Sequence, residues 1–156
     1  MQLDKEIEGK AYVHWKAWQE AYASLLPQEF LQERRTLNSC RQQAFAYPQN
    51  TLVAIIEEKV VGFSCYGQSN SSDLSDAGEV YALYLLADYY HQKIGYQLLQ
   101  ATFEKLSAYN KIVLWVVEGN HRAISFYEKV GFSFDGAKKV VELGKEITEY
   151  RMVFSR

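Results

Sequence analysis

Features that would mark a secreted or membrane protein are scarce in this sequence. Its 156 residues include two cysteines, Cys40 and Cys65, which do not form a CxxC pair. The sequence shows no secretory leader, and no apolar run approaches the roughly 20 residues that a membrane span requires. We therefore predict a cytoplasmic protein without membrane contacts, in which both cysteines are reduced and serve as packing residues.

An excess of one charge is lacking as well. Lys and Arg number 17 against 19 Asp and Glu, so the net charge is −2 and the pI is near 5.9. This balance provides no basic surface, and we predict no nucleic-acid partner. With 48% hydrophobic and 15% aromatic residues, the composition is that of a folded globular chain. Neither repeats nor low-complexity linkers interrupt it, which predicts a single domain over residues 1–156.

Helical spacing of apolar residues is found first near the N-terminus. Residues 8–24 carry apolar side chains at three- and four-residue intervals, which predicts a helix with one apolar face. Pro27 fits the first turn of a second helix, because proline lacks only an N–H that the first turn leaves unpaired. We expect this second helix to end before Pro48. Its apolar positions are Phe30, Leu31, Leu37 and Phe45.

Strand-like segments follow the two helices. Residues 51–58 and 60–67 are rich in β-branched and apolar residues and meet at a tight charged turn, Glu58-Lys59, which predicts a hairpin. A polar segment without periodicity, 68–78, predicts a loop. It leads to a third strand over 79–86.

The second half of the chain alternates helices and strands. Apolar spacing from Ile94 to Leu106 predicts a helix, and the apolar run at 111–118 predicts a strand buried on both faces. Asn120 is a residue type that commonly caps a helix, and Gly131 is a typical helix stop. The residues after Gly131 predict a closing pair of strands.

The turn between the third strand and the next helix is the first candidate site. A strand that runs directly into a helix directs several backbone N–H groups and the positive end of the helix dipole at one point, and that point attracts phosphate. Gly95 stands where the helix begins and allows an anion to come close to the backbone. The polar turn Tyr90–Lys93 immediately precedes it.

A second pattern follows the apolar strand at 111–118. Its residues fit the spacing N-x-x-A-x-x-F-Y-x-x-x-G-F at every defined position. They are Asn120, Ala123, Phe126, Tyr127, Gly131 and Phe132. Together with the preceding turn, this pattern resembles the GNAT superfamily of N-acetyltransferases, and the resemblance extends over residues 50–154.

The phosphate turn differs from the pattern usual in that family, Q/R-x-x-G-x-G/A. Tyr90 replaces the Gln or Arg, His91 and Lys93 stand where glycine is usual, and Gly95 keeps the final small position. Because lysine tolerates ordinary helical dihedrals, we expect Lys93 to adopt them. Its ammonium would lie either beside a pyrophosphate or in solvent, and His91 is expected to be an exposed turn residue.

The resemblance implies a fold and an activity. The fold is α/β (α+β), a single GNAT-like domain with a mixed central sheet of about six or seven strands, flanked by helices and splayed between its two central parallel strands. The implied reaction is transfer of an acetyl group from acetyl-coenzyme A to a primary amine, by direct attack through a tetrahedral intermediate. No metal is implied.

The resemblance also implies which residues hold acetyl-coenzyme A. The backbone N–H of Leu85 would polarise the thioester carbonyl, with Leu83 and Tyr84 shaping the acetyl site. Backbone N–H groups from Gln92 to Tyr96 would hold the pyrophosphate. Asn120 would bind the cofactor arm, cap its helix, or do both. The complete implied set is Leu83, Tyr84, Leu85, Tyr90, His91, Gln92, Lys93, Ile94, Gly95, Tyr96, Asn120, Ala123 and Phe126.

Two side chains are candidates for proton transfer. Tyr127 would donate a proton to the leaving thiolate, since a phenol with a pKa of about 10 is protonated at neutral pH. The alternative is that its ring only packs against the cofactor. Glu79 stands where related enzymes often place a general base that acts through water, and the alternative is an ordinary carboxylate at the start of a strand.

The identity of the acceptor substrate is the aspect of the function that the sequence predicts least. We expect a small-molecule or peptide amine bound beside the two N-terminal helices, with Trp15, Trp18 and Tyr22 as either wall or core residues. Trp115 is expected in the core. The family's first strand is absent from residues 1–10, which exposes the edge formed by 51–58 and favours a homodimer. Alternatives to the enzyme are an inactive acyl-coenzyme A sensor and a structural interaction domain.

Overall fold

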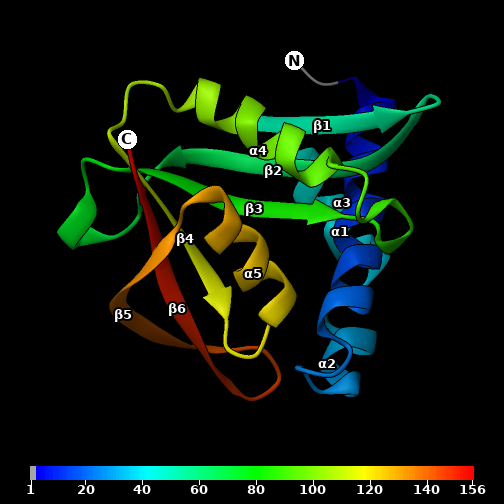
Figure 1. Cartoon of the computed structure of the whole chain (residues 1–156). Coiled ribbons are helices and arrows are strands. Elements are labelled where there is room, and N and C mark those ends of the chain that lie inside the picture. The colour runs from blue at the N-terminus through cyan, green and yellow to red at the C-terminus, as the bar shows by residue number, and fades with distance from the viewer. Residues whose placement is uncertain (1–2) are drawn as a thin grey trace.

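The computed structural model describes residues 3–156 and contains a six-stranded mixed sheet with helices on both faces (Figure 1). The strand order is β1-β2-β3-β4-β6-β5, and only β3 and β4 pair in parallel. The predicted α+β class with a mixed sheet is confirmed. The strands are β1 (Thr51–Ile56), β2 (Lys59–Gln68), β3 (Gly78–Leu85), β4 (Lys111–Val117), β5 (Ser133–Glu142) and β6 (Glu146–Ser155). The helices are α1 (Asp4–Tyr22), α2 (Gln28–Glu33), α3 (Leu37–Ala46), α4 (Ile94–Lys105) and α5 (His121–Val130), with short 3₁₀ turns η1 (Ser72–Leu74) and η2 (Ala87–Tyr89).

The segment after Pro27 forms two helices, so the prediction of one continuous helix was wrong. α2 ends at Glu33, and the side-chain oxygen of Thr36 accepts a hydrogen bond from the Ser39 N–H at 3.1 Å. A threonine in this role starts a new helix, because it satisfies an N–H that the first turn leaves unpaired. α3 then ends at Ala46, before Pro48, as expected.

The helices cover opposite faces of the first half of the sheet. On one face, Val13 of α1 packs with Val60 and Phe63 of β2. On the other face, Leu99 of α4 packs in a cluster with Val80 of β3. Burying these side chains stabilises the layers by roughly 25 cal/mol for each Å² of apolar surface removed from water. In this half of the sheet, α1 therefore covers one face and α4 covers the other.

The hairpin between β1 and β2 turns one residue earlier than predicted. Glu57 and Glu58 occupy the turn, with φ angles of 50° and 66°. Two consecutive residues with positive φ match the twist of the flanking strands and make a tight two-residue connection. Lys59 consequently begins β2.

β1 lies at an edge of the sheet. Within the described residues the chain enters α1 at Asp4 and forms no strand before it. Met1 and Gln2, which the expectation of a missing first strand also covered, lie outside the described residues. The homodimer suggested by this edge stays a prediction.

Membrane-spanning and metal-binding features are not found in residues 3–156. No helix there combines the length and apolar character needed to cross a bilayer. The same residues contain no group of three or more His, Cys, Asp or Glu side chains placed to hold a metal ion. Both cysteines are free, Cys40 buried and Cys65 half-buried.

Candidate active site

The two central strands separate after a short stretch of pairing. β3 pairs with β4 only at Gly78 with Ile112 and at Glu79 with Val113. Beyond these two pairs, β3 stays bonded to β2 and β4 stays bonded to β6. Figure 1 shows the two halves of the sheet running in different directions from this point. The predicted splay is confirmed, and it leaves an opening between the ends of β3 and β4.

One backbone donor on β3 faces this opening. The N–H of Leu86 donates to the carbonyl of Val61 on β2 at 2.9 Å. Neighbouring residues of an extended chain direct their N–H groups to opposite sides, so the N–H of Leu85 is directed away from β2 and into the gap. A carbonyl oxygen placed in the gap would find a donor there.

A bulge in β3 sets which side chains flank the opening. Cys65 of β2 pairs with Ala82 and Tyr66 pairs with Val80, so Tyr81 is an extra residue in β3. Beyond the bulge, Leu83 packs with the α4 and α5 side of the core. Tyr84 packs on the α1 side, where its ring is stacked on His14 with 5.9 Å between centroids. Burial lowers the pKa of His14 to about 4, helped by Arg35 and Lys10, so this ring is neutral at pH 7.

The turn between η2 and α4 has two residues in the left-handed region. His91 has φ 66°, and Lys93, the N-cap of α4, has φ 63° and ψ 11°. The expectation of helical dihedrals for Lys93 was therefore wrong. Glycine adopts this conformation without strain, whereas a side chain makes it costly. The backbone keeps a shape suited to glycine, although the sequence at these positions is not glycine.

Several N–H groups at the start of α4 lack backbone partners. The first bond of the helix is from the Gln97 N–H to the Lys93 carbonyl, at 3.0 Å. The N–H groups just before it, from Ile94 to Tyr96, have no backbone acceptor among the described residues. A side chain added at Gly95 would meet only the Phe126 ring, 3.7 Å from its Cβ. The space above Gly95 is open to a ligand, and the N-terminal dipole favours an anion there.

Arg122 lies beside this turn and was not among the site residues predicted from the sequence. Its guanidinium carbon is 3.0 Å from the centroid of the Tyr90 ring, and the residue is exposed in the first turn of α5. The contact links α5 to the turn and adds a positive charge near the open N–H groups. Arg122 falls on an undefined position of the N-x-x-A pattern, so only its charge could have marked it.

The predicted proton donor, Tyr127, is buried in the core between β4 and α5. Its ring contacts Phe126 and Phe132, at centroid distances of 5.3 and 5.7 Å. Burial raises the pKa of Tyr127 well above its usual range, and the neighbouring Tyr84 raises it further. The phenol is therefore protonated at neutral pH.

Asn120 stands at the predicted N-cap position of α5, but its side chain does not cap the helix. Its side chain makes no capping hydrogen bond, and its backbone has φ −79° and ψ 66°. Capping residues usually have an extended backbone that directs the side chain at the next turn, which this conformation does not. Its main chain is bonded instead, with the N–H donating to Val117 at 3.1 Å. The Asn120 side chain is left free to contact a ligand, while Ala123 packs against the core.

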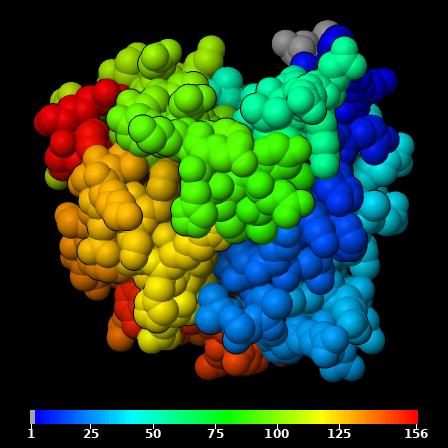
Figure 2. Space-filling model, turned by 45° about the vertical axis from the view of Figure 1, so that its right-hand side comes forward, coloured from blue at the N-terminus to red at the C-terminus, as the bar shows by residue number. Residues whose placement is uncertain are grey.

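A cleft of about 320 Å³ opens on the α1 side of the same gap. Glu79 lines it and is 6% exposed. Its Oε1 accepts a hydrogen bond from the Asn70 N–H at 3.0 Å, and burial raises its pKa. Trp18 and Tyr22 of α1 also line the cleft, whereas Trp15 is not among the lining residues. Figure 2 shows α1 in blue, the segment at and after the end of β3 in green, and the segment at the end of β4 and the start of α5 in yellow, meeting on one face.

Four further residues of the cleft were missed or misplaced from the sequence. Trp115 was expected in the core but is only half-buried and lines the cleft. Tyr81, Lys139 and Glu149 line it as well. Alternation along the closing strands places Glu149 and Lys139 on one face, as their direct pairing shows. Which face that would be depends on the strand order, which the sequence pattern does not reveal.

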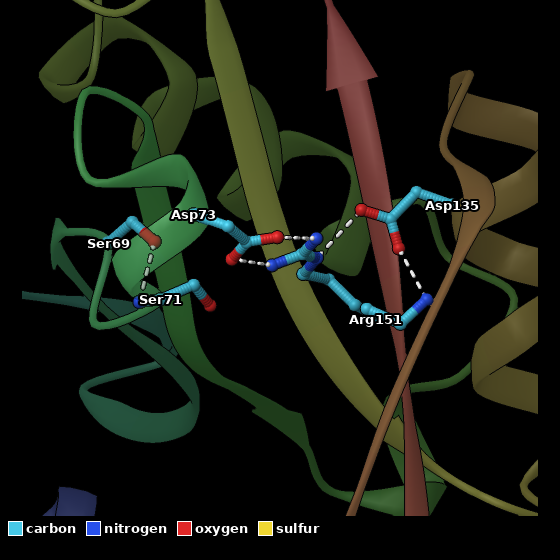
Figure 3. Close-up of polar contacts among 6 residues, drawn as sticks. Ser69, Ser71, Asp73, Asp135 and Arg151 are labelled. Carbon is cyan, nitrogen blue, oxygen red and sulfur yellow. Dashed lines mark hydrogen bonds and ion pairs between the residues drawn. The ribbon is translucent and has the colours of Figure 1, made fainter.

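A buried arginine holds one wall of this cleft. The Arg151 side chain is 7% exposed and binds both oxygens of Asp73 at 2.7 Å and one oxygen of Asp135 at 2.7 Å (Figure 3). Bidentate pairing of this kind fixes geometry as well as charge. It ties the loop between β2 and β3 to β5 and β6. Asn70 belongs to the same loop, so the clamp also keeps the donor to Glu79 in place.

Replacing Lys93 by glycine is expected to stabilise the protein. Relief of the left-handed conformation should raise the free energy of unfolding by about 1 kcal/mol, measured by urea denaturation. The matched control is Gln97→Gly, an exposed helical position of α4, where the same change should cost about 1 kcal/mol. A loss of stability in Lys93→Gly would mean that the turn does not require positive φ.

Comparison with known proteins assigns the family. Residues 14–132 match the acetyltransferase (GNAT) family model. An uncharacterised N-acetyltransferase of Bacillus subtilis, YuaI, is 29% identical over 133 residues, which cover 80% of this chain and 73% of the relative. PH1933 from Pyrococcus horikoshii superposes with a TM-score of 0.74 at 23% identity, covering 100% of this chain and 94% of the other. PaiA N-acetyltransferase from Thermoplasma acidophilum, solved in complex with coenzyme A, superposes with a TM-score of 0.72 at 20% identity. The match covers 99% of this chain and 96% of the other. The family match spans well over half of the sequence, and the chain therefore belongs to the acetyltransferase (GNAT) family.

Proposed function

We propose that this protein is an N-acetyltransferase that transfers the acetyl group of acetyl-coenzyme A to a primary amine by direct attack. The observation that carries the proposal is the opening between β3 and β4, flanked on one face by the α4 turn and on the other by the cleft. Acetyl-coenzyme A supplies an activated acyl group. The opening joins the two faces, so the acyl group and the amine can approach from opposite sides.

The chain's own groups fit the parts of such a cosubstrate. The unpaired N–H groups from Ile94 to Tyr96 suit a diphosphate, and Lys93 and Arg122 add positive charge beside them. Leu83 and Tyr84 flank the gap, where the N–H of Leu85 is placed to donate to a thioester carbonyl. A donor aimed at oxygen that gains charge during the reaction lowers the barrier.

Two residues are assigned to proton transfer. Glu79 is the proposed base, acting on the amine through water, and its raised pKa brings it closer to the range in which a base is effective. Tyr127 is the proposed acid, because burial keeps its phenol protonated and its helix, α5, follows β4, one of the two strands that border the gap. The two lie on opposite faces of the sheet, since Glu79 lines the cleft and Tyr127 belongs to the α4 and α5 core.

The test is a thiol-release assay with acetyl-coenzyme A across a panel of primary amines, combined with isothermal titration of the cofactor. We expect measurable affinity and thiol release that depends on the amine, with the acetylated product identified by mass. Binding without acetylated product for any amine would instead support an acyl-coenzyme A sensor. The absence of binding would contradict both functions.

A further inference from the structure

The cleft is lined by aromatic side chains, and its charged side chains are more often negative than positive. Its aromatic side chains include Trp18, Tyr84 and Trp115, and its charged ones are Glu79, Glu149 and Lys139. Burial raises the pKa of Glu149, Lys139 lowers it and Glu79 raises it, so the charges of the cleft act on one another. Carboxylates and aromatic faces together attract ammonium groups.

The one lysine of the cleft is already engaged. The Lys139 ammonium is 4.0 Å from Oε1 of Glu149 and 4.2 Å from the centroid of the Trp115 ring. Arg151, close by, is held by Asp73 and Asp135 and offers no free charge. Among the described residues that line the cleft, an acceptor with a carboxylate would therefore find no unpaired cation.

The position of Lys139 indicates which chemical group fits this corner of the cleft. An ammonium there meets an aromatic face and a carboxylate at the same time. The Lys139 side chain is 46% exposed, while that of Glu149 is 19% exposed. A half-exposed lysine can move into solvent at small cost, because exposed ion pairs contribute only about 0 to 1 kcal/mol. The corner would then be open to an ammonium from a ligand.

We propose that the acceptor is a diamine or longer polyamine whose second ammonium replaces that of Lys139 between Trp115 and Glu149. This inference rests on the proposed N-acetyltransferase function and specifies its substrate class. The reacting nitrogen lies toward Glu79 and Tyr84, at the gap between β3 and β4. The cleft, at about 320 Å³, has room for a short aliphatic chain between these two ends.

The test compares acceptors of similar length that differ at the far end. Putrescine ends in an ammonium, pentylamine in a methyl group and γ-aminobutyrate in a carboxylate. We expect kcat/KM to be at least about tenfold higher for putrescine than for pentylamine, because the second ammonium gains both the Trp115 ring and the Glu149 carboxylate. γ-Aminobutyrate should be the poorest of the three.

Two variants locate the effect in the cleft. Glu149→Gln should lower kcat/KM for putrescine by about threefold to fivefold, as for a partly exposed ion pair, and leave kcat/KM for pentylamine nearly unchanged. Lys139→Gln should raise kcat/KM for putrescine by about threefold, because the competing ammonium is gone. The matched controls are Glu146→Gln and Lys138→Gln, which alter exposed residues of the same strands outside the cleft. They should leave kcat/KM unchanged for both putrescine and pentylamine.

A binding measurement separates this inference from the transferase assignment. Trp18 and Trp115 line the cleft, so putrescine should change the tryptophan fluorescence of the protein with coenzyme A bound, and Glu149→Gln should weaken that titration. Equal use of pentylamine, or a loss of γ-aminobutyrate activity in Lys139→Gln, would overturn the diamine proposal while leaving the transferase intact. If acetyl-coenzyme A binds but no amine is acetylated, the transferase assignment fails, and the fluorescence titration still decides whether the cleft takes a dication.

Discussion

The Tyr127→Phe variant should turn over about a hundredfold more slowly than the unmodified protein, because a positioned general acid contributes at least about that factor. Phenylalanine retains the ring that contacts Phe126 and Phe132 and loses only the hydroxyl. The affinity for acetyl-coenzyme A should therefore change little. Steady-state thiol release gives kcat, and isothermal titration gives the dissociation constant.

The control for this variant is Tyr47→Phe, which removes a phenol that is 69% exposed. It should leave both kcat and cofactor affinity unchanged. Equal turnover of Tyr127→Phe and the unmodified protein would remove Tyr127 from the acid role and leave its ring as a packing group. A parallel loss of affinity and turnover would assign it to cofactor binding.

The second large effect is expected at Gly95. Changing it to glutamate should weaken acetyl-coenzyme A binding by at least about tenfold, because the new carboxylate would stand next to the phosphates. The protein itself has space for the side chain, since the nearest atom to an added Cβ is in the Phe126 ring at 3.7 Å. The melting temperature should therefore be maintained, and a carboxylate in the first turn of a helix is favourable in the free protein.

Two neutral variants separate the causes of this loss. Gly95→Gln has nearly the shape of the glutamate variant without its charge, so the difference in affinity between the two measures repulsion. Gly95→Ala adds only a methyl group and should have the smallest effect. An unchanged dissociation constant in Gly95→Glu, with the fold intact, would show that the phosphates are not bound at the start of α4.

The parts of this protein that were predicted well are those governed by local patterns. Three- and four-residue spacing of apolar side chains identified α1 and α4, because a helix buries one stripe of its surface. α5 was predicted from Asn120 and Gly131, residue types that commonly begin and end helices. The stop at Gly131 was also correct, as its φ of 122° is accessible to glycine and strained for other residues. The break between α2 and α3 was missed because both segments have helical composition and only residues 34–36 separate them.

The backbone conformation of the turn before α4 differs from the one that its residue types favour. At Lys93 the local preference is for ordinary dihedrals, yet φ is 63°. The chain must leave β3, reverse and enter α4 with its first N–H groups unpaired, and packing of both elements supplies the free energy for that strain. A sequence pattern that requires glycine at these positions therefore fails to recognise a turn whose backbone already has the conformation of glycine.

The sequence by itself determined the order of helices and strands, the strand-to-helix turn at Gly95 and the position of Tyr127, because each depends on neighbours within a few residues. Only the tertiary structure decided which charges share the cleft. Glu79, Trp115, Lys139 and Glu149 come from β3, β4, β5 and β6, and they meet on one face because the sheet places β6 between β4 and β5. That order is set by pairing between distant strands, which depends on the packing of the whole sheet.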